Sequence, residues 1–266
     1  MATCPSCLHL KTAEMPATTA DAAAPPLAGS MQWYAWLYTP PPARDVLRAL
    51  LALEPELRSI ASAHIDHGVA HLKLQWWREE IQRLAEGAPR HPLTRAIQQA
   101  APEARSASLP LQDLLSAVEL DLARASFASA AELDRYFDLA DGLQRALVAA
   151  IHAPHPPDCV TQFASAIGQA VRGVEIIRDR RQDVLPGRTG LQPESLAARS
   201  RDQWRRAQAA IAGGDFAALR GQRVYGALHI ALLDHIERGQ FHDGGSPAEL
   251  GSVKCLWTAW RTARQH

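Results

Sequence analysis

The spacing of apolar residues constrains the fold of this chain more than any other feature of its sequence. From Pro42 onward, apolar side chains recur every three or four residues, which places them on one face of a helix. The clearest case is the segment 109–125, in which one stripe holds Leu111, Leu114, Leu115, Val118 and Leu122. Alternation with a period of two is scarce and β-branched runs are few, which argues against a sheet. We therefore predict an all-α domain of about eight or nine helices.

The ends of the predicted helices follow from this periodicity and from the positions of proline and glycine. Pro55 falls inside the first long segment, where it should kink or break the helix. The small residues Ala164, Gly168 and Ala170 should let another helix or a ligand approach closely. The predicted helices are 44–63, 66–84, a short one ending at 100, 109–125, 131–151, 159–183, 199–211, 217–238 and 247–264.

The first 30 residues differ from the rest because they are rich in Ala, Thr and Pro and carry no helical pattern. We predict a disordered N-terminal extension over 1–30, followed by one domain over 31–266. They also lack the apolar core of a secretory signal. Translation from Met31, rather than Met1, is therefore an open hypothesis.

The charge argues against a nucleic-acid partner, and the hydropathy argues against a membrane-spanning helix. The formal net charge is zero, so we expect no nucleic-acid partner. No apolar run reaches the roughly 18 residues of a membrane-spanning helix, and no strongly basic amphipathic anchor stands out. We expect a cytoplasmic protein and leave peripheral membrane association open.

Three small motifs favour structural over functional interpretations. Cys4 and Cys7 form an isolated CxxC in the polar leader, which is weak evidence for a metal. The histidines His64, His67 and His71 share helical spacing, but nothing nearby completes a set of metal ligands. The pair Trp76-Trp77 is better explained as core than as the wall of a substrate site.

The segment 175–188 carries the strongest functional signal. Asp179 and Asp183 stand four residues apart in a predicted helix, and Glu175 lies one turn earlier on the same face. Carboxylates that repel one another in this way fit a divalent cation, and the neighbouring Arg178 and Arg188 fit phosphate. A solvated helix face crossed by salt bridges would give the same pattern.

Several segments, taken in order, resemble the squalene/phytoene synthase family, whose members join two prenyl diphosphates head to head. The resemblance extends from Trp33 to Leu196. It rests on Leu74-Gln75-Trp76-Trp77-Arg78-Glu79-Glu80, His91-Pro92, Arg95-Ala96-Ile97, Asp121-Leu122, Glu132-Leu133, Tyr136, Gly142 and the segment 168–183 with Gly187-Arg188. It implies an isoprenoid synthase-type helical bundle around a central apolar cavity.

The resemblance also implies roles for individual residues. Asp179 and Asp183 match the second aspartate-rich motif, which would bind Mg²⁺ and through it the substrate diphosphate, with Glu175 as a further metal ligand. Arg178 and Arg188 match arginines expected near the diphosphate. Tyr136, assigned with the two aspartates to catalysis, and Asp121 match polar positions that line the cavity. The expected substrate is farnesyl or geranylgeranyl diphosphate.

The chain departs from the family at the first aspartate-rich motif, where it has Arg58, Ser59 and Ser62. Arginine cannot bind Mg²⁺, although it can pair with a phosphate directly. Arg172 and Glu175 also replace the Gln and Asn that the family prefers. Two hypotheses follow: a Mg²⁺-dependent prenyltransferase, with catalysis in doubt, or a non-catalytic binding or assembly protein with a protein partner. The second resembles a mitochondrial assembly factor for respiratory complex I.

Overall fold

The computed structural model describes residues 24–62, 65–101, 104–152, 155–179, 192–214, 216–239 and 248–265. Across these ranges the chain forms eleven α-helices and two short 3₁₀ helices, and no strand. The prediction of an all-α protein is therefore confirmed.

The helices keep close to the predicted segments. In chain order they are α1 (Met31–Tyr38), α2 (Pro41–Ser59), α3 (His67–Glu86), α4 (Pro92–Ala100), η1 (Ala104–Ala107), α5 (Ser108–Leu122), α6 (Ala130–Ala140), α7 (Gly142–Ile151), α8 (Asp158–Asp179), α9 (Pro193–Ala210), η3 (Ala217–Leu219), α10 (Arg220–Arg238) and α11 (Ser252–Ala263).

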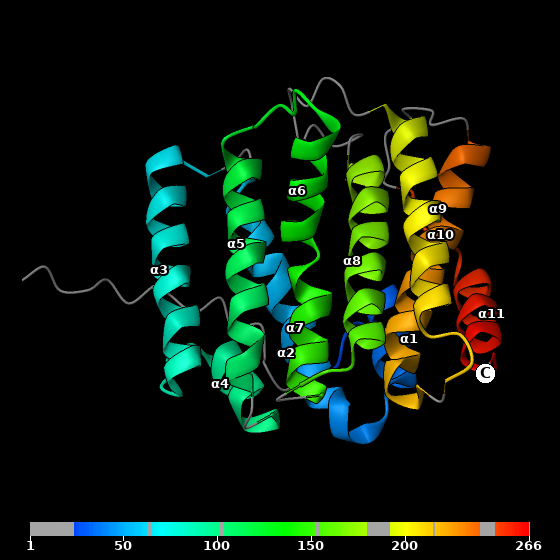
Figure 1. Ribbon diagram of the computed structural model, residues 1–266, viewed down its shortest axis with the longest axis horizontal. Helices are drawn as coiled ribbons and strands as arrows, with labels where there is room; N and C mark the ends of the chain where they lie inside the picture. Colours follow the sequence, from blue (N-terminus) through cyan, green and yellow to red (C-terminus); the bar gives the residue numbers. More distant parts are fainter. Residues whose placement is uncertain are drawn as a thin grey trace, which may run out of the picture.

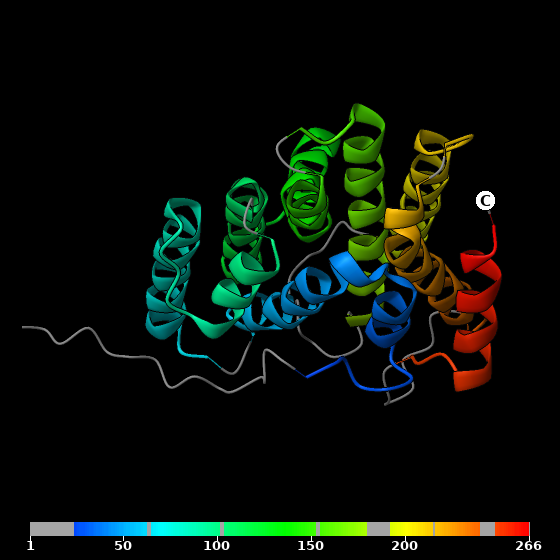
Figure 2. The ribbon, with the colours of Figure 1, turned by 90° about the horizontal axis from the view of Figure 1, so that it is seen from below.

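Most of the helices stand side by side in a row, with α3 at one edge and α11 at the other (Figure 1). Helix α8 lies in the middle of this row and ends at the top of the view. Seen from below, α1 and α2 lie together along one side of the row (Figure 2). Helix α8 therefore has neighbours on several sides, which makes it the natural place for residues from distant segments to meet.

Several details differ from the prediction: α1 was not among the predicted helices, and α9 begins at Pro193 rather than at 199. Pro55 does not break its helix, because α2 continues through it to Ser59. The predicted helix 131–151 is instead two helices, α6 and α7, which meet at Asp141. A side chain on Gly142 would place its Cβ 2.1 Å from the carbonyl oxygen of Pro110, so the close approach to α5 requires glycine at this corner.

Local side-chain contacts fix several helix starts and stops. Ser30, Asp66 and Ser129 cap α1, α3 and α6 by accepting hydrogen bonds from backbone N–H groups. Gly87 ends α3 in a left-handed conformation, with φ +79°, that favours glycine. The cap at Ser30 lies in the predicted disordered extension, of which the structure describes 24–30; residues 1–23 lie outside the described ranges.

The apolar residues form three buried clusters. The largest joins α2, α3, α5, α7 and α8, and it contains Trp77, with Trp76 packed against its edge. The pair is thus core, as predicted. A second cluster surrounds the C-terminal half of α8, and a third joins α1, α10 and α11.

The packing of α1 against α10 is unusually close. A Cβ at Gly221 of α10 would lie 1.8 Å from Oγ1 of Thr39 and 2.5 Å from the carbonyl oxygen of Ala35. The first helix is therefore fixed to the tenth by direct backbone contact.

Within the part of the chain that is described, no helix is both long enough and apolar enough to cross a bilayer.

Candidate functional site

The last two turns of α8 bring together residues from five helices. Arg172, Glu175 and Asp179 lie three and four residues apart, so they share one face of α8. The first two are buried, and Asp179 ends the helix with its side chain partly exposed. Of the predicted stripe of carboxylates, Glu175 therefore faces inward and Asp179 lies at the edge, and Asp183 is outside the described residues.

Arg172 is the hub of this cluster. Its Nη2 donates to Oδ2 of Asp121 on α5 at 2.9 Å, and its Nε donates to the hydroxyl of Tyr136 on α6 at 2.9 Å. Its Nη1 donates to Oε2 of Glu175 at 3.3 Å. Asp121, Tyr136 and Glu175 were each singled out from the sequence. The structure brings them together through an arginine that the sequence marked only as a departure from the family.

Arg58 joins the same cluster from α2. Its Nε and Nη2 donate to Oε1 of Glu54, one turn back in the helix, at 3.0 and 2.8 Å. Its Nε also lies 3.9 Å from Oε2 of Glu175. Its Nη1 is buried and has no hydrogen-bond partner among the described residues. Arg58 thus links α2 to α8 and retains one unused donor.

The arginines decide the charge state of the buried carboxyl groups. Burial alone would raise the pKa of Glu175, but Arg58, Arg172 and Arg178 outweigh it and lower the pKa to about 2. For Glu54 burial is the larger effect, so its pKa is raised despite the attraction of Arg58. The pKa of Arg172 stays well above its usual value because Tyr136, Asp121 and Glu175 together overcome its burial. The cluster is therefore a charged network in which each anion has a cation beside it.

Helix α10 closes the cluster with two buried residues. Nδ1 of His229 lies 2.9 Å from the carbonyl oxygen of Tyr225, and the two rings are 4.4 Å apart. Burial, reinforced by Glu54 and Glu175, raises the pKa of Tyr225 well above its usual value. Burial also lowers the pKa of His229, which favours the neutral imidazole.

Sequence reasoning missed Glu54, Tyr225 and His229. The spacing of Tyr225 and His229, four residues apart on a helix, was an available signal that they share a face. Nothing in the spacing indicates that this face is turned toward α8. Asp66 takes no part in the cluster, because it caps α3 by accepting from the N–H groups of Gly68 and Val69.

Arg178 and Asp179 form the outer edge of the cluster. The guanidinium of Arg178 donates twice to its neighbour, from Nε at 2.7 Å and from Nη2 at 3.1 Å. Both residues line a cavity of about 560 Å³ between the turn that precedes α1 and the start of α11. The apolar side chains of Leu27, Met31, Leu232 and Leu250 also line it. Asp183 and Arg188, the two remaining predicted site residues, lie outside the described residues.

The described residues do not fit a Mg²⁺ ion held between α2 and α8. Such an ion needs carboxylate oxygens from both helices. On α2 the carboxyl group of Glu54 is bound by Arg58, and Glu175 and Asp121 are likewise bound by arginines. Asp179 is engaged by Arg178 on both oxygens. Across the described part of the chain, no group of three or more His, Cys, Asp or Glu side chains is arranged to hold a metal.

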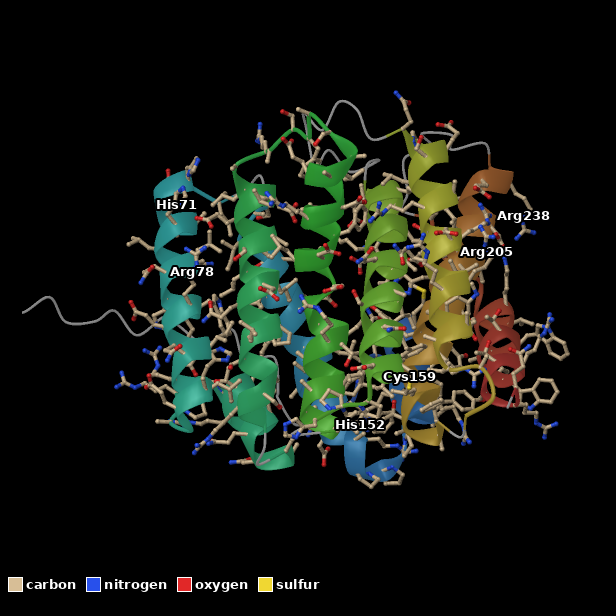
Figure 3. The ribbon with its side chains drawn as sticks, in the orientation of Figure 1. His71, Arg78, His152, Cys159, Arg205 and Arg238 are labelled. Atoms are coloured by element: carbon tan, nitrogen blue, oxygen red, sulfur yellow. The ribbon has the colours of Figure 1, made fainter. Side chains whose placement is uncertain are left out.

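The histidines with helical spacing lie apart from this cluster. The rings of His67 and His71 stack 4.6 Å apart near the start of α3, and His64 lies outside the described residues. His71 lies at the edge of the molecule, far from α8 (Figure 3).

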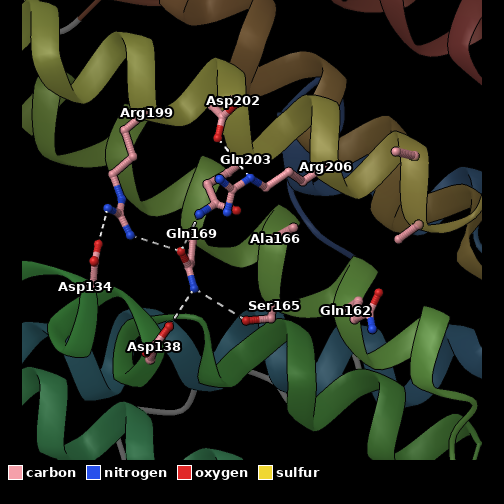
Figure 4. A pocket seen from close by; sticks show the side chains of 12 residues that line it. Asp134, Asp138, Gln162, Ser165, Ala166, Gln169, Arg199, Asp202, Gln203 and Arg206 are labelled. Atoms are coloured by element: carbon pink, nitrogen blue, oxygen red, sulfur yellow. Dashed lines mark hydrogen bonds and ion pairs between the residues drawn. The ribbon is translucent and has the colours of Figure 1, made fainter. Parts of the chain in front are cut away.

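A larger cavity of about 920 Å³ lies between α6, α8 and α9 (Figure 4). Its centre is Gln169, which donates to Asp138 at 2.9 Å and accepts from Arg199 at 3.2 Å and from Gln203 at 2.9 Å. Because this lining is polar and bonded to itself, the cavity does not suit an apolar prenyl chain. The central apolar cavity implied by the family resemblance stays a prediction.

Solved structures share this arrangement of helices. A dehydrosqualene synthase solved with a ligand matches with a TM-score of 0.72 at 16% identity, over 87% of this chain and 90% of that one. A squalene synthase, HpnC from Alicyclobacillus acidocaldarius, matches with a TM-score of 0.61 at 16% identity, over 79% of this chain and 88% of that one. At these identities the matches establish an isoprenoid synthase-type fold.

A family model identifies the chain more narrowly. The model for squalene/phytoene synthases matches residues 29–194, which is more than half of the 266 residues. The chain therefore belongs to the squalene/phytoene synthase family, whose members are head-to-head prenyltransferases and typically depend on Mg²⁺. A search of curated proteins by sequence gives no significant match.

Proposed function

We propose that this protein binds a prenyl diphosphate at the end of α8 without condensing two of them, as a non-catalytic member of its family. Farnesyl or geranylgeranyl diphosphate is the expected ligand. The cations proposed for its diphosphate are Arg178, which lines the cavity at this end of α8, and Arg58, which lies beside Glu175 on the same helix. Neither needs a bridging metal. The single observation that carries this proposal is the position of Arg58 between Glu54 and Glu175.

The charge at Arg58 supports binding and argues against ionisation. Its unpartnered Nη1 is a donor suited to a phosphate oxygen. A metal at the same place would both orient the diphosphate and neutralise it as a leaving group, whereas an arginine that is already shared with two carboxylates supplies less positive charge. The site can therefore hold the ground state better than it can stabilise a departing diphosphate.

The cavity beside Arg178 supports a prenyl ligand in particular. It places a cation next to the apolar side chains of Leu27, Met31, Leu232 and Leu250, which matches the two halves of such a molecule.

One observation favours the alternative, a Mg²⁺-dependent head-to-head transferase. The side chain of Asp179 is 23% exposed and lines the cavity, so it can be reached by a ligand that displaces Arg178. Asp179 together with Asp183, with or without Glu175, would then hold Mg²⁺ on one side of the diphosphate. The catalytic roles assigned to Asp179, Asp183 and Tyr136 belong to this alternative.

Two measurements on the purified protein distinguish the two functions. The first is the affinity for farnesyl and for geranylgeranyl diphosphate, by calorimetry with Mg²⁺ and with EDTA. The second is diphosphate release with extraction of any C30 or C40 hydrocarbon. We expect binding that survives EDTA and no release above background.

Matched variants test the part played by Arg58. Arg58→Gln should weaken binding by about tenfold, the loss of one charge-assisted contact. Arg48→Gln, on the same helix but paired with the exposed Asp45, should leave binding unchanged. Metal-dependent binding that is lost in the double variant Asp179→Asn with Asp183→Asn, together with hydrocarbon product, would establish the transferase instead.

A further inference from the structure

Helix α11 carries its largest apolar side chains on the outside of the molecule. Val253, Leu256, Trp257 and Trp260 are 83, 54, 59 and 39% exposed. Their positions, separated by three, one and three residues, place all four on one stripe of the helix. We call this set the α11 stripe. Its two indole rings lie 5.2 Å apart.

The opposite face of α11 explains why the helix is held in this orientation. Cys255 and Ala259 are buried against Val224 and Leu228 of α10, and Thr262 is buried as well. Small side chains let α11 lie close to α10, so the helix is fixed without using its tryptophans. Helix α11 also forms the outer edge of the row of helices (Figure 2). The stripe is therefore a contiguous apolar surface that the fold leaves uncovered.

The charges on α11 indicate what covers the stripe. Residues 252–265 include Lys254, Arg261 and Arg264 and no Asp or Glu. The guanidinium of Arg264 lies 4.5 Å from the ring centre of Trp260, at the edge of the stripe. Tryptophans flanked by cations suit the boundary between lipid headgroups and acyl chains, where an indole is apolar at one end and polar at the other. An anionic bilayer also attracts each cation.

A second copy of the chain fits the stripe less well. In a symmetric pair the same patch would face itself, which brings like charges at Arg261 and Arg264 together. Four side chains on one short helix also fall far below the roughly 20 residues a side of a stable protein interface.

We infer that the α11 stripe binds the surface of an anionic lipid bilayer, with Trp257 and Trp260 inserted at the level of the headgroups. Arg261 and Arg264 then face the lipid phosphates, whereas Lys254 donates to the carbonyl oxygen of Ala231 on α10. The inference rests on the surface of α11 alone and does not depend on the proposed ligand of α8.

The test is co-sedimentation of the full chain with vesicles. Vesicles of phosphatidylcholine with phosphatidylglycerol should bind the protein, and vesicles of phosphatidylcholine alone should bind it more weakly. The double variant Trp257→Ser with Trp260→Ser should lower partitioning to the anionic vesicles by at least about tenfold, since two buried indoles are lost. Because both side chains are exposed, the variant should keep the melting temperature of the parent.

A matched control uses exposed apolar residues elsewhere. Val69 and Leu72 of α3 are 45 and 73% exposed at the opposite edge of the row. Val69→Ser with Leu72→Ser should partition like the parent. Partitioning of the tryptophan variant equal to that of the parent would overturn the inference. Failure of the parent protein to bind the vesicles would also overturn it. So would a parent protein that is dimeric in solution and becomes monomeric when both tryptophans are replaced.

Discussion

The interpretation of single residues near the end of α8 depends on the partners that the structure gives them. From the sequence, Arg172 and Glu175 are departures from a metal-binding family. In the structure both belong to one buried network of ion pairs and hydrogen bonds that joins α5, α6 and α8. A network of this kind holds its position because removal of any one charge leaves another buried without a partner.

Asp141 should make stability depend on pH in mildly acidic solution. Burial raises its pKa from 3.8 to about 6, although Arg145 and Ser165 both donate to its carboxylate. Between these two values the folded protein keeps a proton that the unfolded chain has released. The contribution of Asp141 to the free energy of unfolding is therefore largest near or below pH 4. It falls as the pH rises to about 6, by up to about 3 kcal/mol.

The measurement for Asp141 is the free energy of unfolding in urea at several pH values between 4 and 7. The variant Asp141→Asn cannot titrate, so its curve should lack this decline while keeping the contribution of every other group. The difference between the two proteins should shift in favour of the variant as the pH rises. Parallel curves would contradict the raised pKa.

At the scale of helices, the sequence predicted which segments are helical better than it predicted which helices contact one another. Periodicity correctly predicted an all-α chain and most helix positions, because each helix buries one stripe. It did not reveal that 131–151 divides at Asp141, since the division depends on Pro110 of another helix. Nor could it pair Arg172 with Asp121, which lies 51 positions earlier in the chain. The candidate site shows the same limit: family resemblance indicated Asp121 and Tyr136, whereas Glu54 and His229 follow only from packing.

Gly168 shows what the small residues of α8 do. A Cβ at this position would lie 2.7 Å from Cβ and 2.9 Å from Cα of Asp141, so glycine allows α8 to approach the junction of α6 and α7. Of the two options left open by the sequence, the approach of another helix is the one confirmed. Gly168→Ala should destabilise the protein by about 1–3 kcal/mol, because it forces two backbones apart.

Gly173→Ala is a matched control in the same helix. Its Cβ would meet the hydroxyl of Ser200 at 2.2 Å, but the rest of that side chain lies 3.6 Å away and the hydroxyl can rotate. Both variants gain the same helix propensity, so the comparison isolates the backbone clash. Equal stability of the two variants in urea unfolding would refute this account of Gly168.

The molecule as a whole is closed by a contact between distant parts of the chain. Gly221→Ala should separate α1 from α10, since the new methyl group would meet the backbone oxygen of Ala35 as well as the hydroxyl of Thr39. We expect a lower melting temperature and faster hydrogen exchange in the amides of α1 than in those of α3. Adding Thr39→Ala removes one of the two clashes and should restore part of the loss. Unchanged exchange in α1 would show that the contact is dispensable.

The same contact has a consequence for how the chain acquires its structure during synthesis. Helix α1 leaves the ribosome before α10 and α11, yet much of the surface against which it packs belongs to those two helices. Until those helices have been translated, the side of α1 that carries Tyr34 has no partner. Ala35 on the other side can already pack with the interior formed by α2, α3, α5, α7 and α8. Helix α1 is thus translated early but completes its packing late. The side of α1 that faces α10 therefore stays exposed for most of the synthesis of the chain.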